Sequence, residues 1–178
     1  MDITKVPAGK NPPHEINVVI ENPRGDGPVK YEFDTESGAI FVSRLLYTAM
    51  FYPADYGFIP DTLSTGGAPL DCLVMGRHPL VPGCVLPSRP IGVLILEDER
   101  GPDQKILAVP VDKLHPYYED ISSFRDLRPE QLEKIEHFFA HYKDLEKDKR
   151  VRVKHWAGPD RAAELIRDGM DRFVARAH

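Results

Sequence analysis

The sequence predicts an α+β domain that is mainly β, in which a small closed barrel carries two α-helices on its outside. Three observations predict this fold class. Short β-branched or alternating runs dominate the first two thirds of the chain. Gly and Pro, with 13 and 17 residues, are spread between these runs, as in a β-rich domain with many turns. Two apolar stripes with helical spacing lie toward the C-terminal end, and strands followed by helices favour a barrel with helices packed against it.

The clearest strand signal is a hairpin near the N-terminus. Residues 29–33 alternate apolar side chains with Lys30 and Glu32, so the two charged residues share one strand face. The segment 34–38 has the composition of a turn. We therefore expect residues 40–44 to return as the second strand of the hairpin.

The remaining strands are predicted from short apolar or alternating runs. The longest is 85–96, in which Pro87 and Pro90 indicate bulges or an edge position. Residues 52–60 are expected to be irregular. The other runs expected to form strands are 16–21, 72–75, 105–109 and 150–155.

Two helices are predicted after these strands. The first is expected from Pro129 to about Lys147, because a proline and an acid stand in its first turn. The second is expected from Pro159 to about Ala177. Each has a single apolar stripe, formed by Leu132, Ile135, Phe139 and Tyr142 in the first and by Ala162, Leu165, Ile166, Met170 and Phe173 in the second.

Composition limits the domain count and the classes of partner. A chain of 178 residues without a repeat or a linker fits a single domain, 1–178. A net charge of -5 argues against a nucleic-acid or an anionic membrane surface. No run approaches the ~20 apolar residues of a membrane span, and the N-terminus lacks the apolar core of a signal peptide. Cys72 and Cys84 are expected to be buried free thiols, so the expected location is the cytoplasm.

Three acids stand where a metal site could form. Asp71 begins an apolar strand, Asp98 ends another, and Asp103 follows across a Gly-Pro turn. Hard oxygen ligands at strand ends suit Mg²⁺, which binds few carboxylates and keeps several waters. Spacing alone leaves two interpretations open, because an acidic run before Arg100 is more often a solvated hairpin tip.

A set of cationic and phenolic side chains has the donors that phosphoryl groups require. Lys and Arg donate charged hydrogen bonds to phosphate, and phenols add neutral donors. Taken one at a time, each Lys or Arg is more often an exposed surface charge. The members of this set are Lys30, Arg44, Lys105, Lys143, Tyr52, Tyr56 and Tyr142.

Read together, several segments of the chain resemble the soluble family I inorganic pyrophosphatases of bacteria. The resemblance runs from Val6 to Trp156, which is most of the chain. It implies a small distorted five-stranded barrel of OB-like topology, with two flanking helices and the active site in the mouth of the barrel. The segments that carry it are 19–21, 29–32, 48–53, 55–59, 62–73, 97–105 and 137–147.

The resemblance also implies an activity, a cofactor and an assembly. The activity is the hydrolysis of inorganic pyrophosphate to two phosphates by a metal-activated water. The cofactor is Mg²⁺, several ions per site, with Mn²⁺ or Zn²⁺ as alternatives. The assembly is a homo-oligomer, expected to be a hexamer, in which the helix with His137 and His141 forms subunit contacts.

Roles for individual residues follow from the same resemblance. The metal ligands are Asp71, Asp98 and Asp103. The catalytic residues are Asp71, Tyr56 and Lys30. The residues that bind pyrophosphate or phosphate are Lys30, Glu32, Arg44, Tyr56, Lys105, Tyr142 and Lys143. Three further residues, Glu21, Glu32 and Tyr52, surround the metal ligands and the phosphate-binding residues. They are expected to hold metal-bound waters and cationic side chains.

One motif departs from the family pattern. The family signature is Asp-x-Asp-Pro-x-Asp, and here Gly66 and Ala68 replace its first two aspartates, so that only Asp71 remains. In the family the first aspartate binds a metal and the second accepts the proton of the attacking water. A positioned general base contributes roughly 10²–10⁴-fold to rate, so Ala68 should cost about that much. The acids nearest in sequence, Asp55 and Asp61, are not obvious substitutes.

Three functional hypotheses follow from this mixture of retained and lost residues. The first is an Mg²⁺-dependent inorganic diphosphatase with impaired hydrolysis. The second is a catalytically weak or inactive homologue that binds phosphate or pyrophosphate, or that joins an active paralogue in mixed oligomers. The third is a shifted substrate, such as a longer polyphosphate or a phosphate ester, because a less acidic loop repels a polyanion less.

Overall fold

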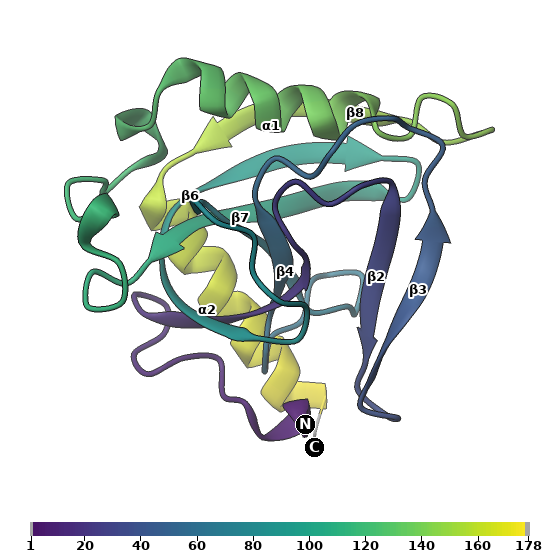
Figure 1. The fold of residues 1–178 in the computed structure, drawn as a ribbon. Coiled ribbons are helices and arrows are strands. Elements are labelled where there is room, and N and C mark those ends of the chain that lie inside the picture. Colours follow the sequence, from purple (N-terminus) through teal and green to yellow (C-terminus); the bar gives the residue numbers. More distant parts are fainter. Residues whose placement is uncertain (1, 177–178) are drawn as a thin grey trace.

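The computed structural model describes residues 2–176. Strands dominate the part of the chain before residue 111. Along the chain, one α-helix precedes the last strand and the other follows it (Figure 1). The strands are β1 (Ile16–Asn22), β2 (Val29–Asp34), β3 (Ala39–Leu45), β4 (Asp55–Ile59), β5 (Leu70–Val74), β6 (Val85–Asp98), β7 (Gly101–Pro110) and β8 (Val151–Ala157). The helices are α1 (Pro129–His141) and α2 (Pro159–Arg176), with 3₁₀ turns at Ile3–Lys5, Pro116–Tyr118 and Phe124–Asp126.

Five strands close into a ring. The pairing order is β1-β4-β5-β7-β6, and β6 pairs again with β1. The β5–β7 pair is parallel and the other pairs are antiparallel, while β8 extends the sheet beyond β6. The mainly β fold with a five-stranded barrel and two helices is therefore confirmed.

Each helix covers a different part of the ring. Ile135, Phe138 and Phe139 of α1 pack into one apolar cluster, which also contains Tyr52 and Tyr56. Ala162, Leu165 and Ile166 of α2 pack into a second cluster with residues of β1, β5 and β7. In Figure 1, α1 runs across the top of the ring and α2 passes beneath it. No helix within residues 2–176 is both long enough and apolar enough to span a membrane.

The hairpin of β2 and β3 forms a separate two-stranded sheet beside the ring (Figure 1). Two side chains of β1 hold β2 in place. The Asn22 amide donates to the Tyr31 carbonyl at 3.1 Å and accepts from the Tyr31 N–H at 2.9 Å. The Glu21 carboxylate accepts from the Phe33 N–H at 2.7 Å. The outer strand β3 is largely exposed.

The expectation that residues 52–60 are irregular is wrong for its second half. Strand β4 is buried throughout and pairs with β1 on one side and with β5 on the other. Because neither face of β4 meets water, its sequence does not alternate. Gly57 makes this strand fit, since a Cβ there would lie 1.8 Å from the Val19 carbonyl oxygen.

Helix α1 ends at His141, about six residues before the expected end. Residues 142–148 form successive turns instead, and the Glu146 N–H donates to the Lys143 carbonyl at 2.9 Å. Asp148 adopts the left-handed conformation with φ 61°, which no residue of a continuing helix can have. These turns bring Glu146 to Arg44 of the hairpin and Lys143 to Asp98 and Glu99 at the β6–β7 turn.

Most of the other sequence predictions agree with the structure, although Pro87 pairs with Asn17 without a register shift. The interruption expected at Pro90 is a shift in the β6–β7 register between Pro90 and Gly92. Helix α2 begins at Pro159 as predicted; Ala177, its expected end, lies outside the described residues. Cys72 is a buried free thiol, whereas Cys84 is only partly buried.

Candidate active site

A cavity of about 390 Å³ opens at one end of the ring. Its wall is built from the loop before β5, the turn between β6 and β7, one residue of β2 and the end of α1. Nine of the residues singled out from the sequence line it, and these are Lys30, Tyr52, Tyr56, Asp71, Asp98, Asp103, Lys105, Tyr142 and Lys143.

The Lys105 ammonium lies between two carboxylates in this cavity. It contacts Asp71 Oδ2 and is 2.8 Å from Asp103 Oδ2. Only 6% of Lys105 is exposed, while the two acids are about one-third exposed. Burial acts to lower the pKa of Lys105, but the Asp71 and Asp103 carboxylates raise it well above its ordinary value. The ammonium group therefore stays charged.

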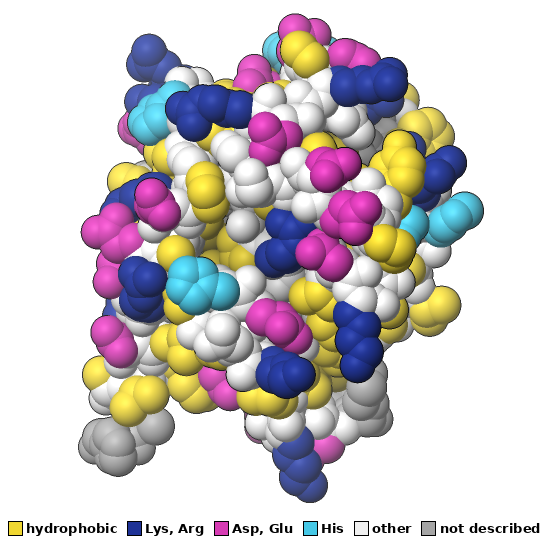
Figure 2. Space-filling model, turned by 90° about the vertical axis from the view of Figure 1, so that its left-hand side faces the viewer, with side chains coloured by type: hydrophobic (Ala, Val, Ile, Leu, Met, Phe, Trp, Pro, Cys, Tyr) yellow, Lys and Arg dark blue, Asp and Glu magenta, His cyan; other side chains and the backbone are white. Residues whose placement is uncertain are grey.

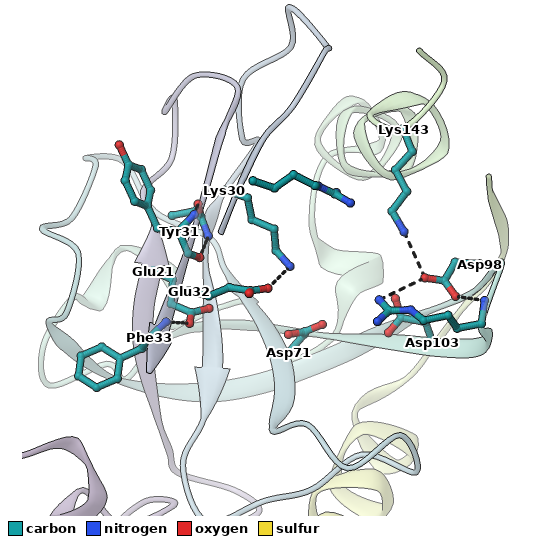
Figure 3. A network of polar contacts seen from close by, with 12 residues as sticks. Glu21, Lys30, Tyr31, Glu32, Phe33, Asp71, Asp98, Asp103 and Lys143 are labelled. Carbon is teal, nitrogen blue, oxygen red and sulfur yellow. Dashed lines mark hydrogen bonds and ion pairs between the residues drawn. The ribbon is translucent and has the colours of Figure 1, made fainter. Parts of the chain in front are cut away.

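A second ion pair joins the β6–β7 turn to the end of α1. Lys143 Nζ lies 3.2 Å from Asp98 Oδ2 and 3.5 Å from Glu99 Oε1. Burial acts to raise the pKa of Asp98, but the Arg100 N–H at 2.8 Å and the Lys143 ammonium bring it below its ordinary value. Figure 3 shows Lys143 pointing down from the helix toward Asp98. Asp98 is thus an anion held beside a buried cation.

The hairpin side of the cavity holds a third group of charges. Lys30 and Glu32 share a strand face, as predicted, and Lys30 Nζ binds the Glu32 carboxylate. Glu21 lies next to this pair on β1, and burial raises its pKa to about 8. Burial acts to raise the pKa of Glu32 too, yet Lys30 lowers it below its ordinary value. In Figure 3, the Glu32 and Asp71 side chains point toward the same space.

Three tyrosines, Tyr52, Tyr56 and Tyr142, line the apolar side of the cavity together with Phe138 and Phe139. Tyr52 packs on Phe138 with ring centroids 4.9 Å apart, and Tyr142 stacks on the same ring at 5.3 Å. Burial raises the pKa of both Tyr52 and Tyr56 well above the ordinary value. These two hydroxyl groups therefore stay protonated at neutral pH and can donate hydrogen bonds to an anion.

Three candidate residues do not line this cavity. Glu21 and Glu32 line an adjoining cavity of about 760 Å³, which shares Lys30 and Asp71 with the first. Arg44 lines neither cavity. Its Nη1 lies 3.4 Å from Glu146 Oε2, at the junction between β3 and the turns after α1. The position of Arg44 thus depends on a contact that the sequence did not reveal.

The two substituted signature positions do line the main cavity. Gly66 and Ala68 stand in the loop that leads to Asp71. A Cβ added at Gly66 would meet only Ser64 Oγ, at 3.7 Å, and its φ is not positive. The backbone at this position therefore has room for an aspartate side chain.

Asp55 and Asp61, the acids nearest in sequence to Gly66 and Ala68, do not place a carboxylate in the main cavity. Asp55 is buried and accepts N–H groups of Arg24 at 2.9 Å and Leu80 at 3.3 Å, so it stabilises a turn. Asp61 lines the adjoining cavity beside Gly67 and Ala68, and burial raises its pKa. Neither acid lines the main cavity.

The structure also adds residues that sequence reasoning missed. Arg100 and Gln104 line the main cavity, and Glu99 and Glu146 pair with expected phosphate binders. The solvated hairpin tip, one of the two interpretations of the acidic run before Arg100, agrees with the Arg100 side chain, which is 84% exposed. Nothing in the sequence indicated that Glu146 would meet Arg44; its spacing of three residues from Lys143 indicated only that these two residues lie in one turn.

The acids of the cavity fit a hydrated Mg²⁺ ion in their chemistry. Asp71, Asp98 and Asp103 supply hard oxygen ligands around one space, and Mg²⁺ needs only one or two carboxylates with waters and phosphate oxygens. Within residues 2–176, no three acids, histidines or cysteines gather into a cage of their own. Such an ion would therefore take much of its coordination from water and from a bound anion.

The surface away from the cavity has mixed charge. Figure 2 shows the left-hand side of Figure 1, where Lys and Arg side chains are interspersed with Asp and Glu and with single apolar side chains. On this face neither sign of charge forms a broad continuous region. The dense grouping of paired charges described above belongs to the cavity.

A five-stranded ring whose mouth holds acids, buried ammonium groups and protonated phenols has the donors for a compact polyanion and a hard cation. Comparison with known proteins identifies the family. The family model of inorganic pyrophosphatase matches residues 18–174. The chain belongs to the inorganic pyrophosphatase family.

Relatives and solved structures agree with this assignment. The chain is 56% identical over 173 residues to an inorganic pyrophosphatase of Caulobacter vibrioides, covering 97% of this chain and 98% of that protein. It is 55% identical over 170 residues to one of Rhodospirillum rubrum, covering 96% and 95%. The crystal structure of inorganic pyrophosphatase from Thermus thermophilus superposes with a TM-score of 0.92 at 40% identity, covering 98% of this chain and 99% of that one.

Proposed function

We propose that this protein hydrolyses inorganic pyrophosphate to two phosphates by a metal-activated water, at a rate reduced by Gly66 and Ala68. Family membership supports the reaction class. The observation that carries the proposal is the meeting of Asp71, Asp103 and Lys105 in one cavity with the Asp98–Lys143 pair. We also propose that residues 1–178 act as one domain in the cytoplasm.

We assign metal binding to the acidic residues of the cavity and phosphate binding to its cationic residues. Asp71, Asp98 and Asp103 would hold Mg²⁺, while Mn²⁺ or Zn²⁺ are the alternatives to test. Bound there, Mg²⁺ would neutralise phosphate charge and lower the pKa of a water near the phosphorus. Lys30, Lys105 and Lys143 would bind phosphoryl oxygens, with Arg44 and the phenols as further donors.

The absence of the second signature aspartate should lower the rate of pyrophosphate hydrolysis and leave the affinity for pyrophosphate largely unchanged. With alanine at position 68, no carboxylate of the loop can accept the proton of the attacking water. General-base catalysis is worth roughly 10²–10⁴-fold, so turnover should be lower by about that factor than with an aspartate there. The cationic donors are unchanged, so affinity for pyrophosphate should persist.

The alternative is a binding homologue without turnover, or a partner of an active paralogue. It is favoured by the loss of both acids together while the buried ammonium groups remain. Pyrophosphate binding without phosphate release would support this alternative. A third candidate, a longer polyphosphate or a phosphate ester, is tested by including such compounds in the same assay.

The deciding experiment is phosphate release from pyrophosphate by the purified protein, with Mg²⁺, Mn²⁺ and Zn²⁺ scanned across pH. We expect slow, metal-dependent release that Asp71→Ala abolishes. The matched control is Asp120→Ala, because Asp120 is exposed and distant in sequence from the cavity residues. Release equal in the wild type and in Asp71→Ala would contradict the proposal.

We further propose that the protein forms a homo-oligomer, with a hexamer as the expected state. Apolar side chains exposed on and after β3 support an interface, since Phe41, Val42, Leu45 and Tyr47 are each more than half exposed. Light scattering at micromolar concentration tests this assembly. A single monomeric species would refute it.

A further inference from the structure

The hairpin of β2 and β3 contributes three of the candidate site residues, yet it lies outside the ring. Strand β2 is held through Glu21 and Asn22 of β1. Among the ion pairs within residues 2–176, one joins the hairpin to the rest of the chain, and it links Arg44 of β3 to Glu146. This contact therefore secures the exposed edge of the hairpin.

The Arg44–Glu146 pair joins a partly buried guanidinium to a buried carboxylate, and its hydrogen bonding is incomplete. The Glu146 side chain is 8% exposed, and its Oε2 lies 3.4 Å from Arg44 Nη1 and 3.0 Å from Lys149 Nζ. Arg44 Nε and Glu146 Oε1 are also buried, and each lacks a hydrogen-bond partner among residues 2–176. Both unpartnered atoms thus belong to the two members of one ion pair. Nε–H is a donor and Oε1 is an acceptor, so the two atoms are complementary, and a bidentate fork through Nε and Nη2, a geometry that Arg and carboxylate prefer, would use both.

Both members of the Arg44–Glu146 pair lie next to residues that line the cavity. Glu146 follows Lys143 by one turn, and its N–H donates to the Lys143 carbonyl at 2.9 Å. Lys143 is 4% exposed and lines the cavity. Arg44 is close enough to the Tyr52 hydroxyl, another lining group, for its charge to oppose the rise that burial causes in the pKa of that phenol. Arg44 therefore borders the cavity without lining it.

We propose that Glu146 is a positioning residue, which fixes the Arg44 guanidinium and the β3 edge beside the cavity so that Arg44 can bind a phosphoryl group. The inference rests on the proposed function, because it assigns Arg44 to the same anion. A guanidinium has five N–H groups, so a fork to Glu146 uses two and leaves three for phosphate. Glu146 itself contacts neither substrate nor metal in this role.

The test is a double-mutant cycle on anion affinity. The probe is methylenediphosphonate with Mg²⁺, a non-hydrolysable diphosphate, measured by titration calorimetry on the full chain. Glu146→Gln keeps the shape of the side chain and removes its charge, so we expect affinity to fall roughly tenfold. In an Arg44→Gln background the same change should cost less than about twofold. Lys149→Gln, which removes the other cation on Glu146, is the control and should stay within about twofold of wild type.

A second measurement separates positioning from general stability. Hydrogen exchange should rise at the β3 amides in Glu146→Gln and stay unchanged in the ring strands. Glu146→Asp keeps the charge on a shorter side chain and should lie between wild type and Glu146→Gln in affinity. Global exchange in every strand, or an equal loss of affinity with and without Arg44, would overturn the inference.

The outcomes also separate this inference from the proposed function. If the wild type binds the diphosphonate and the cycle shows no coupling, the inference is wrong and the proposed function survives. If the wild type does not bind it with Mg²⁺, both are wrong. Strong coupling together with local exchange in β3 would establish Glu146 as the residue that positions Arg44.

Discussion

Lys105, which is buried, forms an ion pair with the partly exposed Asp71 across the parallel pairing of β5 and β7. The register sets Cys72 opposite Ile106, so the residues just before them, Asp71 and Lys105, lie side by side. Asp103 joins the same ammonium from two residues earlier on β7, on the same strand face. One cation thus neutralises two carboxylates that belong to the proposed metal site.

Lys105→Met should therefore destabilise the protein when no metal is present. Two carboxylates would then face each other without a counter-charge. Because both are about one-third exposed, we expect a loss of about 1–3 kcal/mol in the free energy of unfolding, less than for a fully buried pair. Urea unfolding in chelator and in Mg²⁺ measures it, and Mg²⁺ should recover part of the loss.

The control for this variant is Lys154→Met, which removes a more exposed lysine that pairs with Glu97 on the neighbouring strand. It should cost less than about 1 kcal/mol with or without Mg²⁺. Equal losses for Lys105→Met in chelator and in Mg²⁺ would show that the two acids do not share a metal site.

Restoring both signature acids should raise turnover. Gly66→Asp has room for its Cβ, and Ala68 already carries one, so Gly66→Asp/Ala68→Asp should fold without displacing the loop. The regained base predicts a gain of roughly 10²–10⁴-fold in phosphate release. The matched control is Gly66→Asn/Ala68→Asn, which has the same shape without the charge and should show no such gain. Turnover unchanged by the aspartates would mean that the rest of the cavity is also unsuited to the reaction.

Burial of Glu21 predicts a pH dependence of stability. Its pKa is about 8 in the folded protein and 4.5 ordinarily, so between these values the folded state retains a proton that the unfolded state has lost. The stability that Glu21 contributes is fully present below about pH 4.5 and falls as pH rises toward 8. In metal-free buffer, Glu21→Gln should therefore flatten the decline in the free energy of unfolding between pH 5 and pH 8.

Urea unfolding at several pH values compares this variant with wild type and with Glu36→Gln, a change of an exposed acid on the turn of the hairpin. Glu36→Gln should follow the wild-type pH profile. A Glu21→Gln profile parallel to that of wild type would show that Glu21 titrates at an ordinary pKa in the folded protein.

A methyl group at position 57 should disrupt the ring. In Gly57→Ala the added carbon would lie 1.8 Å from a backbone carbonyl of β1, and neither strand can retreat without breaking its pairing. We expect a loss of at least about 3 kcal/mol in the free energy of unfolding, or failure to fold. Gly27→Ala is the control, because nothing lies within 4 Å of its added carbon. Similar melting temperatures for the two variants would contradict this account.

Prediction from the sequence succeeded where the pattern was local. The alternation in 29–33 identified β2 and placed Lys30 and Glu32 on the same strand face. Pro90 located the irregular register of β6, and Pro159 located the start of α2. In each case the information lies within a few residues, as backbone propensity or side-chain periodicity.

Prediction failed where the structure depends on distant neighbours. Strand β4 was missed because both of its faces are buried, Tyr56 in a cluster with α1 and Ile59 in a cluster with α2, which removes the alternation that marks a half-buried strand. The end of α1 was placed too late, since residues 142–147 have helical character but turn to reach the hairpin and the β6–β7 turn. The pairing of Arg44 with Glu146 had no local signature either.

The sequence by itself determined the fold class, the two helices and the family, because these depend on periodicity and on motifs that can be read along the chain. It also showed that Gly66 and Ala68 stand where the signature has acids. Only the tertiary structure decided which charges meet. It placed Lys105 between Asp71 and Asp103, and it held Arg44 at Glu146 outside the cavity lining. Electrostatic interactions depend on distance and burial, and closure of the ring sets both for residues that are far apart in the sequence.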